Sequence, residues 1–260
     1  MKSSKYILLA VAATLGLTSC EPEFDNELSN ASYKAGEADF TTYVAIGNSL
    51  TSGYMDGTMY RSGQQYSFPN LLAQQFALVG GGEFTQPAFD ADVNNVGGLL
   101  LGGNPIANTK MIINLQVGGP QNINAASTIE VSNLQRTAYN NMGVPGAKSF
   151  HLLAPGYGNL AGVATGAANP YFVRHATTDN TRVLDDAMSK NPTFFTNWIG
   201  SNDVLAYALS GGTGVDRTGN MDPTTYGSND ITDPGYFAGV YSAIINALTS
   251  NGAKGVVATV

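Results

Sequence analysis

Apolar runs and helical repeats alternate along this chain from residue 41 onward. The short runs at 42–47 and 193–199 have the length and the β-branched or aromatic content of buried strands. Apolar residues at helical spacing over 67–80 and 233–251 predict amphipathic helices, each with a proline in its first turn. Such alternation is typical of an α/β domain with a parallel sheet.

Weaker patterns predict four further elements. Residues 136–141 are expected to form a strand, and a helix is expected to start at Ala147. A further helix over 182–190 ends at Asn191-Pro192. The valine-rich segment 254–260 predicts another core strand.

Two segments, 80–135 and 210–233, interrupt this alternation. Residues 80–135 are rich in glycine and asparagine, and a loop of that length inside a domain usually has a function. We interpret it as a lid or rim, with one hairpin strand at Ile113, Leu115 and Val117. Four large side chains before it fit either a pocket mouth or the core: Tyr54, Met55, Met59 and Tyr60.

The first twenty residues predict export. Two lysines precede an apolar run at 6–17, which is shorter than the roughly 20 residues needed to span a bilayer, so residues 1–20 are interpreted as a signal peptide. The run ends in Leu17-Thr18-Ser19-Cys20, which resembles the lipobox of bacterial lipoproteins. The resemblance implies that Cys20 becomes the lipidated N-terminus.

Residues 21–40 are acidic and poor in apolar side chains, which predicts a flexible tether before a domain at 41–260. A tether of this length holds the domain roughly 25 Å from the membrane. Acidic residues directly after the lipidated cysteine resemble the surface-export signal of Bacteroidetes-type lipoproteins. That resemblance implies a location at the outer membrane or cell surface.

Composition narrows the possible partners. The 260 residues carry 12 lysines and arginines against 19 aspartates and glutamates, for a formal charge of −7. Because the cations do not cluster, a nucleic-acid partner is not expected. With 43% apolar residues the chain can bury one sizeable core.

Three turns carry candidate chemistry, each directly after a predicted strand. They are Gly47-Asn48-Ser49, the segment 141–146 (NMGVPG), and Gly200-Ser201-Asn202-Asp203. Ligands of an open parallel sheet bind outside the carboxyl ends of its strands, where these turns are expected to lie. A serine nucleophile needs hydrogen-bond donors for the oxyanion formed on attack, and glycine amides and an asparagine side chain supply such donors.

Over residues 42–260 these turns resemble the SGNH hydrolases, the GDSL-type lipases and esterases. The resemblance implies a three-layer α/β/α sandwich with a parallel, flavodoxin-like sheet. It implies Ser49 as nucleophile, Gly143 and Asn202 as oxyanion donors, and turns supported by Gly47, Asn48, Gly200 and Asp203. The expected reaction is hydrolysis of a small-molecule, lipid or glycan ester, without a metal or organic cofactor.

Two features depart from the family pattern. Asn48 stands where the family usually has aspartate, and an asparagine side chain can make the same turn bond. The family takes its base from an Asp-x-x-His motif, which this sequence lacks, so we expect the 260 residues alone to be nearly inactive. Of the two histidines, His151 is expected to be partly buried in a helix and His175 to lie at the surface.

Each candidate residue also has a purely structural explanation. Ser49 can be a turn hydroxyl, Gly143 a left-handed turn residue, and Asn202 and Asp203 caps of a helix starting at Val204. The alternative function is an inactive surface lipoprotein that binds a glycan or lipid through the same pocket. The spacing of the loop acids matches no calcium loop: Asp216, Asp222, Asp230 and Asp233.

Overall fold

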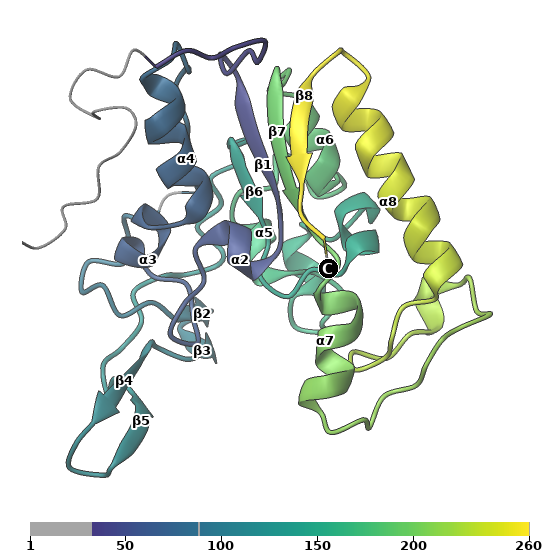
Figure 1. The fold of residues 1–260 in the computed structure, drawn as a ribbon. Coiled ribbons are helices and arrows are strands. Elements are labelled where there is room, and N and C mark those ends of the chain that lie inside the picture. The colour runs from purple at the N-terminus through teal and green to yellow at the C-terminus, as the bar shows by residue number, and fades with distance from the viewer. Residues whose placement is uncertain (1–32, 88, 260) are drawn as a thin grey trace, which may run out of the picture. The chain divides into compact units, whose positions relative to one another are not determined.

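The computed structural model describes residues 33–87 and 89–259, and Ala35–Val260 form one compact unit. At its centre is a four-stranded sheet with the order β6-β1-β7-β8, in which every neighbouring pair is parallel (Figure 1). The strands are β1 (Tyr43–Gly47), β6 (Asn141–Gly143), β7 (Phe194–Trp198) and β8 (Lys254–Val257). Cys20 and the signal peptide lie outside the described residues.

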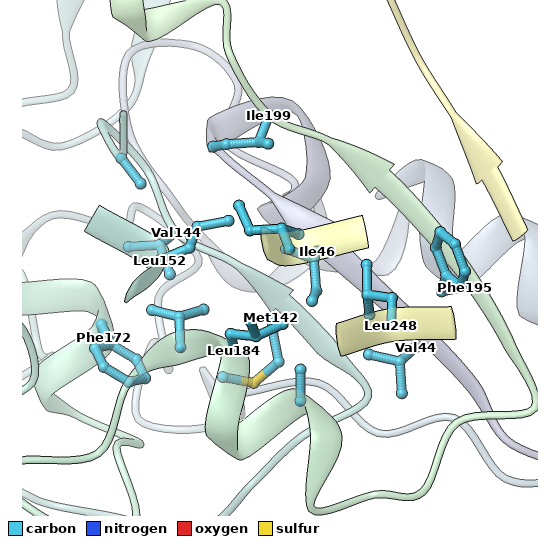
Figure 2. Packing of buried hydrophobic residues seen from close by; sticks show 14 of the residues in the cluster. Val44, Ile46, Met142, Val144, Leu152, Phe172, Leu184, Phe195, Ile199 and Leu248 are labelled. Carbon is cyan, nitrogen blue, oxygen red and sulfur yellow. The ribbon is translucent and has the colours of Figure 1, made fainter. Parts of the chain in front are cut away.

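Helices cover both faces of this sheet, and the alternation of side chains along β1 explains how. Val44 and Ile46 point into a core shared with α6 (Val183–Met188) and α8 (Pro234–Thr249), part of which Figure 2 shows. Tyr43 and Ala45 point the other way, toward α4 (Phe68–Ala77). The domain is therefore an α/β structure built on a parallel sheet, as the sequence pattern predicts.

The strongest sequence patterns correspond to real elements. The predicted strands at 42–47 and 193–199 are β1 and β7, and the helices predicted over 67–80, 182–190 and 233–251 are α4, α6 and α8. Asp233 caps α8 by accepting a hydrogen bond from the Tyr236 amide at 2.7 Å. The shorter elements flanking the strand ends and insertions are α2 (Ser49–Ser52), α3 (Arg61–Gln65), η2 (Ser149–Leu153), η3 (Leu160–Gly162), α5 (Pro170–Val173), α7 (Asn202–Leu209) and η4 (Pro223–Thr225).

Three weaker predictions are wrong in detail. The strand expected over 136–141 begins only at Asn141, because Arg136 has a positive φ and pairs with Asp179 at 2.5 Å instead of joining the sheet. The helix expected from Ala147 is the short 3-10 segment η2. The expected core strand at 254–260 is the edge strand β8, and all four of its residues are exposed.

The segment 80–135 contains two antiparallel hairpins. The first pairs β2 (Leu99–Leu101) with β3 (Asn104–Ala107), and the second pairs β4 (Met111–Asn114) with β5 (Gly119–Asn122). The predicted hairpin strand is therefore real but shifted, since Leu115 and Val117 lie in its turn. The base of the insertion has a small core of its own, composed of Met59, Phe89, Leu99, Ile129, Val131, Ala168 and Val173.

The compact unit begins before the expected end of the tether. Phe40 stacks on Phe76 of α4 with ring centroids 4.0 Å apart, and Glu37 pairs with Lys254 of β8 at 3.2 Å. The residues immediately before β1 thus belong to the fold. None of the described helices is long and apolar enough to cross a membrane.

Candidate functional site

The three predicted turns lie on neighbouring strands at one edge of the sheet. Gly47 at the end of β1 is in register with Gly143 of β6 on one side and with Trp198 of β7 on the other. From β1 the chain goes first to β6 and then to β7 on the opposite side, so the sheet order reverses direction at β1. In open parallel sheets the crevice at such a point is the usual ligand site.

The first turn holds Ser49 by means of the buried side chain of Asn48. The Oδ1 of Asn48 accepts a hydrogen bond from the Leu50 amide at 3.1 Å, and its Nδ2 donates to the Ser201 hydroxyl of the third turn at 2.7 Å. A Cβ on Gly47 would collide with Thr51 and the Trp198 carbonyl. Ser49 itself is half-buried, and its hydroxyl makes no hydrogen bond to a described residue.

The second turn packs directly on the helix that begins with Ser49. A Cβ on Gly143 would collide with the backbone of Thr51 and Ser52, so glycine allows β6 and α2 to approach closely. The Gly143 amide donates to the Oδ1 of Asn141 at 3.0 Å, and the Nδ2 of Asn141 donates to the Thr51 carbonyl at 3.0 Å. The amide of Gly143 is therefore already occupied.

Gly146 in the same turn differs from Gly143. It is exposed, has a φ of 78°, and its amide makes no hydrogen bond to a described residue. A positive φ favours glycine, and because glycine has no side chain, a ligand can approach its backbone amide closely. In the sequence this residue is marked only as the second glycine of Gly143-Val144-Pro145-Gly146, directly after a proline.

The third turn reaches back to the second. Gly200 adopts a φ of 126°, and α7 then begins at Asn202 rather than at Val204. The Asn202 Nδ2 donates to the Ala147 carbonyl at 2.9 Å, so this side chain does not cap its own helix and keeps a second N–H. Each turn is thus hydrogen-bonded or packed against another turn of the same edge.

Asp203 anchors the segment that comes after the second turn instead of capping α7. Its buried carboxylate accepts from the amide and the hydroxyl of Ser149, both at 2.8 Å. Burial raises the pKa of Asp203, while these hydrogen bonds and the nearby Lys148 act in the opposite direction. Asp203 therefore supports the geometry of the site without facing it.

A pocket of about 310 Å³ adjoins the second turn. Gly146, Lys148 and His151 form one wall, and Pro223 and Tyr226 of the insertion 210–233 form another. The four loop acids of this region accept hydrogen bonds from groups of the same insertion or of the helix that follows it. Asp230, for example, accepts from the Val215 amide at 2.9 Å and from Arg217 at 2.5 Å. No group of three or more metal-ligating side chains is present among residues 33–87 and 89–259.

His151 is half-buried in η2 and hydrogen-bonded, as the sequence suggests. Its Nδ1 accepts from the Lys148 amide at 3.0 Å, and its ring stacks on Tyr157 with centroids 4.6 Å apart. Burial, together with the charge of Lys148, lowers the pKa of His151 to about 4. At neutral pH the ring is therefore uncharged with its proton on Nε2, a tautomer that donates at Nε2 instead of accepting a proton there.

His175 is buried, so its expected position at the surface is wrong. It packs edge-on against Phe172 and Tyr139, with ring centroids 5.3 Å and 5.7 Å away. Burial lowers the pKa of His175 to about 3, and the neighbouring charge of Arg174 adds to the effect. The uncharged ring packs among aromatic side chains, which explains why it is buried. The polar residues next to it in the sequence do not indicate this burial.

No family model, no curated protein and no solved structure matches this chain.

Proposed function

We propose that this chain is an ester hydrolase of the SGNH type, anchored to the cell envelope through Cys20. Ser49 would attack the carbonyl carbon of an ester, releasing the alcohol and forming an acyl-enzyme that water then hydrolyses. The substrate would be an acyl or acetyl ester of a small molecule, lipid or glycan. We further propose that the sheet is flavodoxin-like, since the strand order β6-β1-β7-β8 equals the first four strands of that topology.

The observation that supports the proposal is the convergence of three turns distant in sequence. Ser49 follows the strand at which the sheet order reverses, and its hydroxyl is accessible and without a described partner. The bond from Asn48 to Ser201 and the bond from Asn202 to Ala147 tie the three turns together. Acyl transfer requires an accessible hydroxyl with preorganised donors nearby, and turns held together at one edge of a sheet are suited to supply them.

Two groups are suited to stabilise the oxyanion. Asn202 retains one N–H beyond the one given to Ala147. In the second turn we assign the donor to Gly146 rather than Gly143, because the Gly143 amide is committed to Asn141. Gly143 would then act through packing alone, by letting β6 lie against α2.

One observation favours the alternative of a binding lipoprotein without turnover. A serine hydroxyl needs an adjacent base, and neither histidine is arranged as one: His151 accepts at Nδ1, and His175 is buried among aromatic rings. In that case the same edge of the sheet would hold a lipid or glycan ester without cleaving it.

A fluorophosphonate probe distinguishes the two functions. The expected result is labelling at Ser49 in the full-length natural protein extracted from membranes, since the 260 residues alone are expected to be nearly inactive. The labelled residue is located by peptide mass spectrometry, and labelling should be lost in Ser49→Ala. Ser132→Ala, at an exposed serine of the insertion, is the control and should label normally. Removing one oxyanion donor by Asn202→Ala should lower the rate on a short acyl ester about 10²- to 10³-fold.

Equal labelling of wild type and Ser49→Ala would contradict the assignment of the nucleophile. Absence of labelling in both, combined with saturable binding of a non-hydrolysable ester analogue, would favour the binding function. In that outcome the analogue should bind more weakly to Asn202→Ala than to Ser132→Ala.

A further inference from the structure

The β4–β5 hairpin exposes an unusual concentration of apolar side chains. Ile113, Leu115 and Val117 are 68%, 88% and 66% exposed. Met111 and Ile112 on the same hairpin are 41% and 47% exposed. Scattered exposed apolar residues are ordinary, but five within seven consecutive residues form a continuous apolar surface, which is typical of an interaction site.

Both faces of the hairpin are open. Successive residues of a strand point to opposite faces, and Ile112 and Ile113 are both exposed. In Figure 1 the β4–β5 hairpin extends beyond β2 and β3. A groove on another protein would cover one face of a hairpin, whereas an apolar medium surrounds both.

The hairpin carries no charge. The nineteen residues from Met111 to Ile129 include no lysine, arginine, aspartate, glutamate or histidine. The nearest basic side chain, Lys110, lies at the base with its Nζ over the Tyr60 ring at 4.6 Å. The penalty for moving an ionised group into an apolar phase is therefore absent from the tip.

Some polar groups of the hairpin are paired with one another. The strands are in register from Met111 opposite Asn122 to Asn114 opposite Gly119. Asn114 Nδ2 donates to Gln121 Oε1 at 2.7 Å, and the Gly118 amide donates to the Asn114 carbonyl at 2.9 Å. Among the described residues no third strand pairs with the outer backbone groups of this two-stranded sheet, so the hairpin suits the hydrated interface of a bilayer and not its hydrocarbon core.

From these four features we infer that the β4–β5 hairpin inserts into the surface of a lipid bilayer. A four-residue strand reaches about 13 Å, at about 3.3 Å per residue. Elements that lie at the bilayer interface are buried by roughly 5–10 Å. The strands are therefore long enough to carry the turn at 115–118 past the headgroups. Because the hairpin is uncharged, insertion should not require anionic lipid and should persist at high salt.

Insertion is tested with a fluorescent label in the full chain carrying Cys20→Ser, which removes the acylation site. An environment-sensitive dye is attached through Leu115→Cys, and phosphatidylcholine vesicles contain a lipid-borne quencher. The expected result is a blue shift of the emission and several-fold quenching. The matched control is the same dye attached through Leu78→Cys at the end of α4, where the native leucine is 59% exposed.

A second substitution tests whether the apolar side chains of the hairpin cause the insertion. Ile113→Asp should reduce quenching of the dye at position 115 roughly tenfold, because a charge replaces an apolar side chain at the inserting tip. Its far-ultraviolet dichroism and melting temperature should stay at the wild-type values, since Ile113 has little packing to lose.

Equal, water-like emission from the dyes at positions 115 and 78 would overturn the inference. A blue shift that appears without vesicles and grows with protein concentration would also overturn it, because the occupant would then be a second copy of the chain. Ser49→Ala should quench like its parent, so failure of the proposed hydrolysis and failure of insertion are distinguishable.

Discussion

The turns at the carboxyl edge of the sheet bury polar side chains, whereas the β4–β5 hairpin exposes apolar side chains. In the turns, polar side chains such as Asn48 and Asn141 are almost completely buried. In the hairpin, apolar side chains such as Ile113 and Leu115 are largely exposed. Both arrangements run against the usual distribution of residues in a folded protein.

The difference shows how each region is held. Buried polar groups must be paired, and Asn48 and Asn141 each satisfy both ends of their amide, which ties three separate turns to one geometry. The hairpin depends on its own ladder and gains little from the rest of the domain. The turns should therefore respond strongly to small changes, and the hairpin weakly.

The sharpest test of this contrast is the same substitution in both regions. Gly143→Ala would drive a methyl group into the backbone of Thr51 and Ser52, and we expect a loss of about 3 kcal/mol or more in the free energy of unfolding. Gly119→Ala meets no atom within 4 Å and should change the free energy of unfolding by less than about 0.5 kcal/mol. Urea denaturation measures both. Similar losses for the two variants would contradict the contrast.

Acid is expected to affect the region of the turns through His151. Its pKa falls from 6.5 to about 4 on folding, so the unfolded chain binds more protons between these values. The resulting stability is present above pH 6.5 and is lost as the pH falls toward 4, on the order of 3 kcal/mol in total. Buried His175 acts in the same direction, whereas the raised pKa of Asp203 opposes it just above pH 3.8.

Melting temperatures across this pH range provide the measurement. His151→Gln should reduce the dependence on pH, because glutamine does not titrate, and the remainder should come from His175. Residues 111–122 of the hairpin contain no titratable side chain, so Leu115→Ser should leave the slope unchanged. A melting temperature that is constant from pH 6.5 to about 4 would show that the two histidines are not held neutral.

The smallest effect is expected in the hairpin alone. Leu115→Ser removes an apolar side chain that is 88% exposed, so the free energy of unfolding should change by less than about 0.5 kcal/mol. Urea denaturation without lipid measures this value. A loss comparable to that of Gly143→Ala would mean that the hairpin tip is packed against the domain.

The sequence predicts well those elements that depend on residues close together in the chain. The apolar run of β1, the proline-started helices α4 and α8, and the turn residues around Ser49 are all legible in the sequence, since periodicity and capping act over a few residues. The candidate turns could also be placed at strand ends, because parallel strands share one carboxyl edge.

The same reasoning could not assign roles within the turns. Gly143 and Gly146 belong to the same turn, yet the amide of one is taken by Asn141 while the amide of the other is open. Which glycine amide faces outward depends on how β6 packs against α2. Likewise, Asn202 resembles a helix cap in sequence but donates to Ala147, which lies 55 residues earlier.

The residue pattern alone predicts strands and helices of the parallel-sheet kind and three turns with candidate chemistry. Only the folded chain shows that β6 and β7 flank β1, that β8 is an exposed edge strand, that His175 is buried, and that the uncharged apolar hairpin is exposed. Burial and strand pairing depend on contacts between residues far apart in sequence, whereas periodicity and turn preference depend on neighbours.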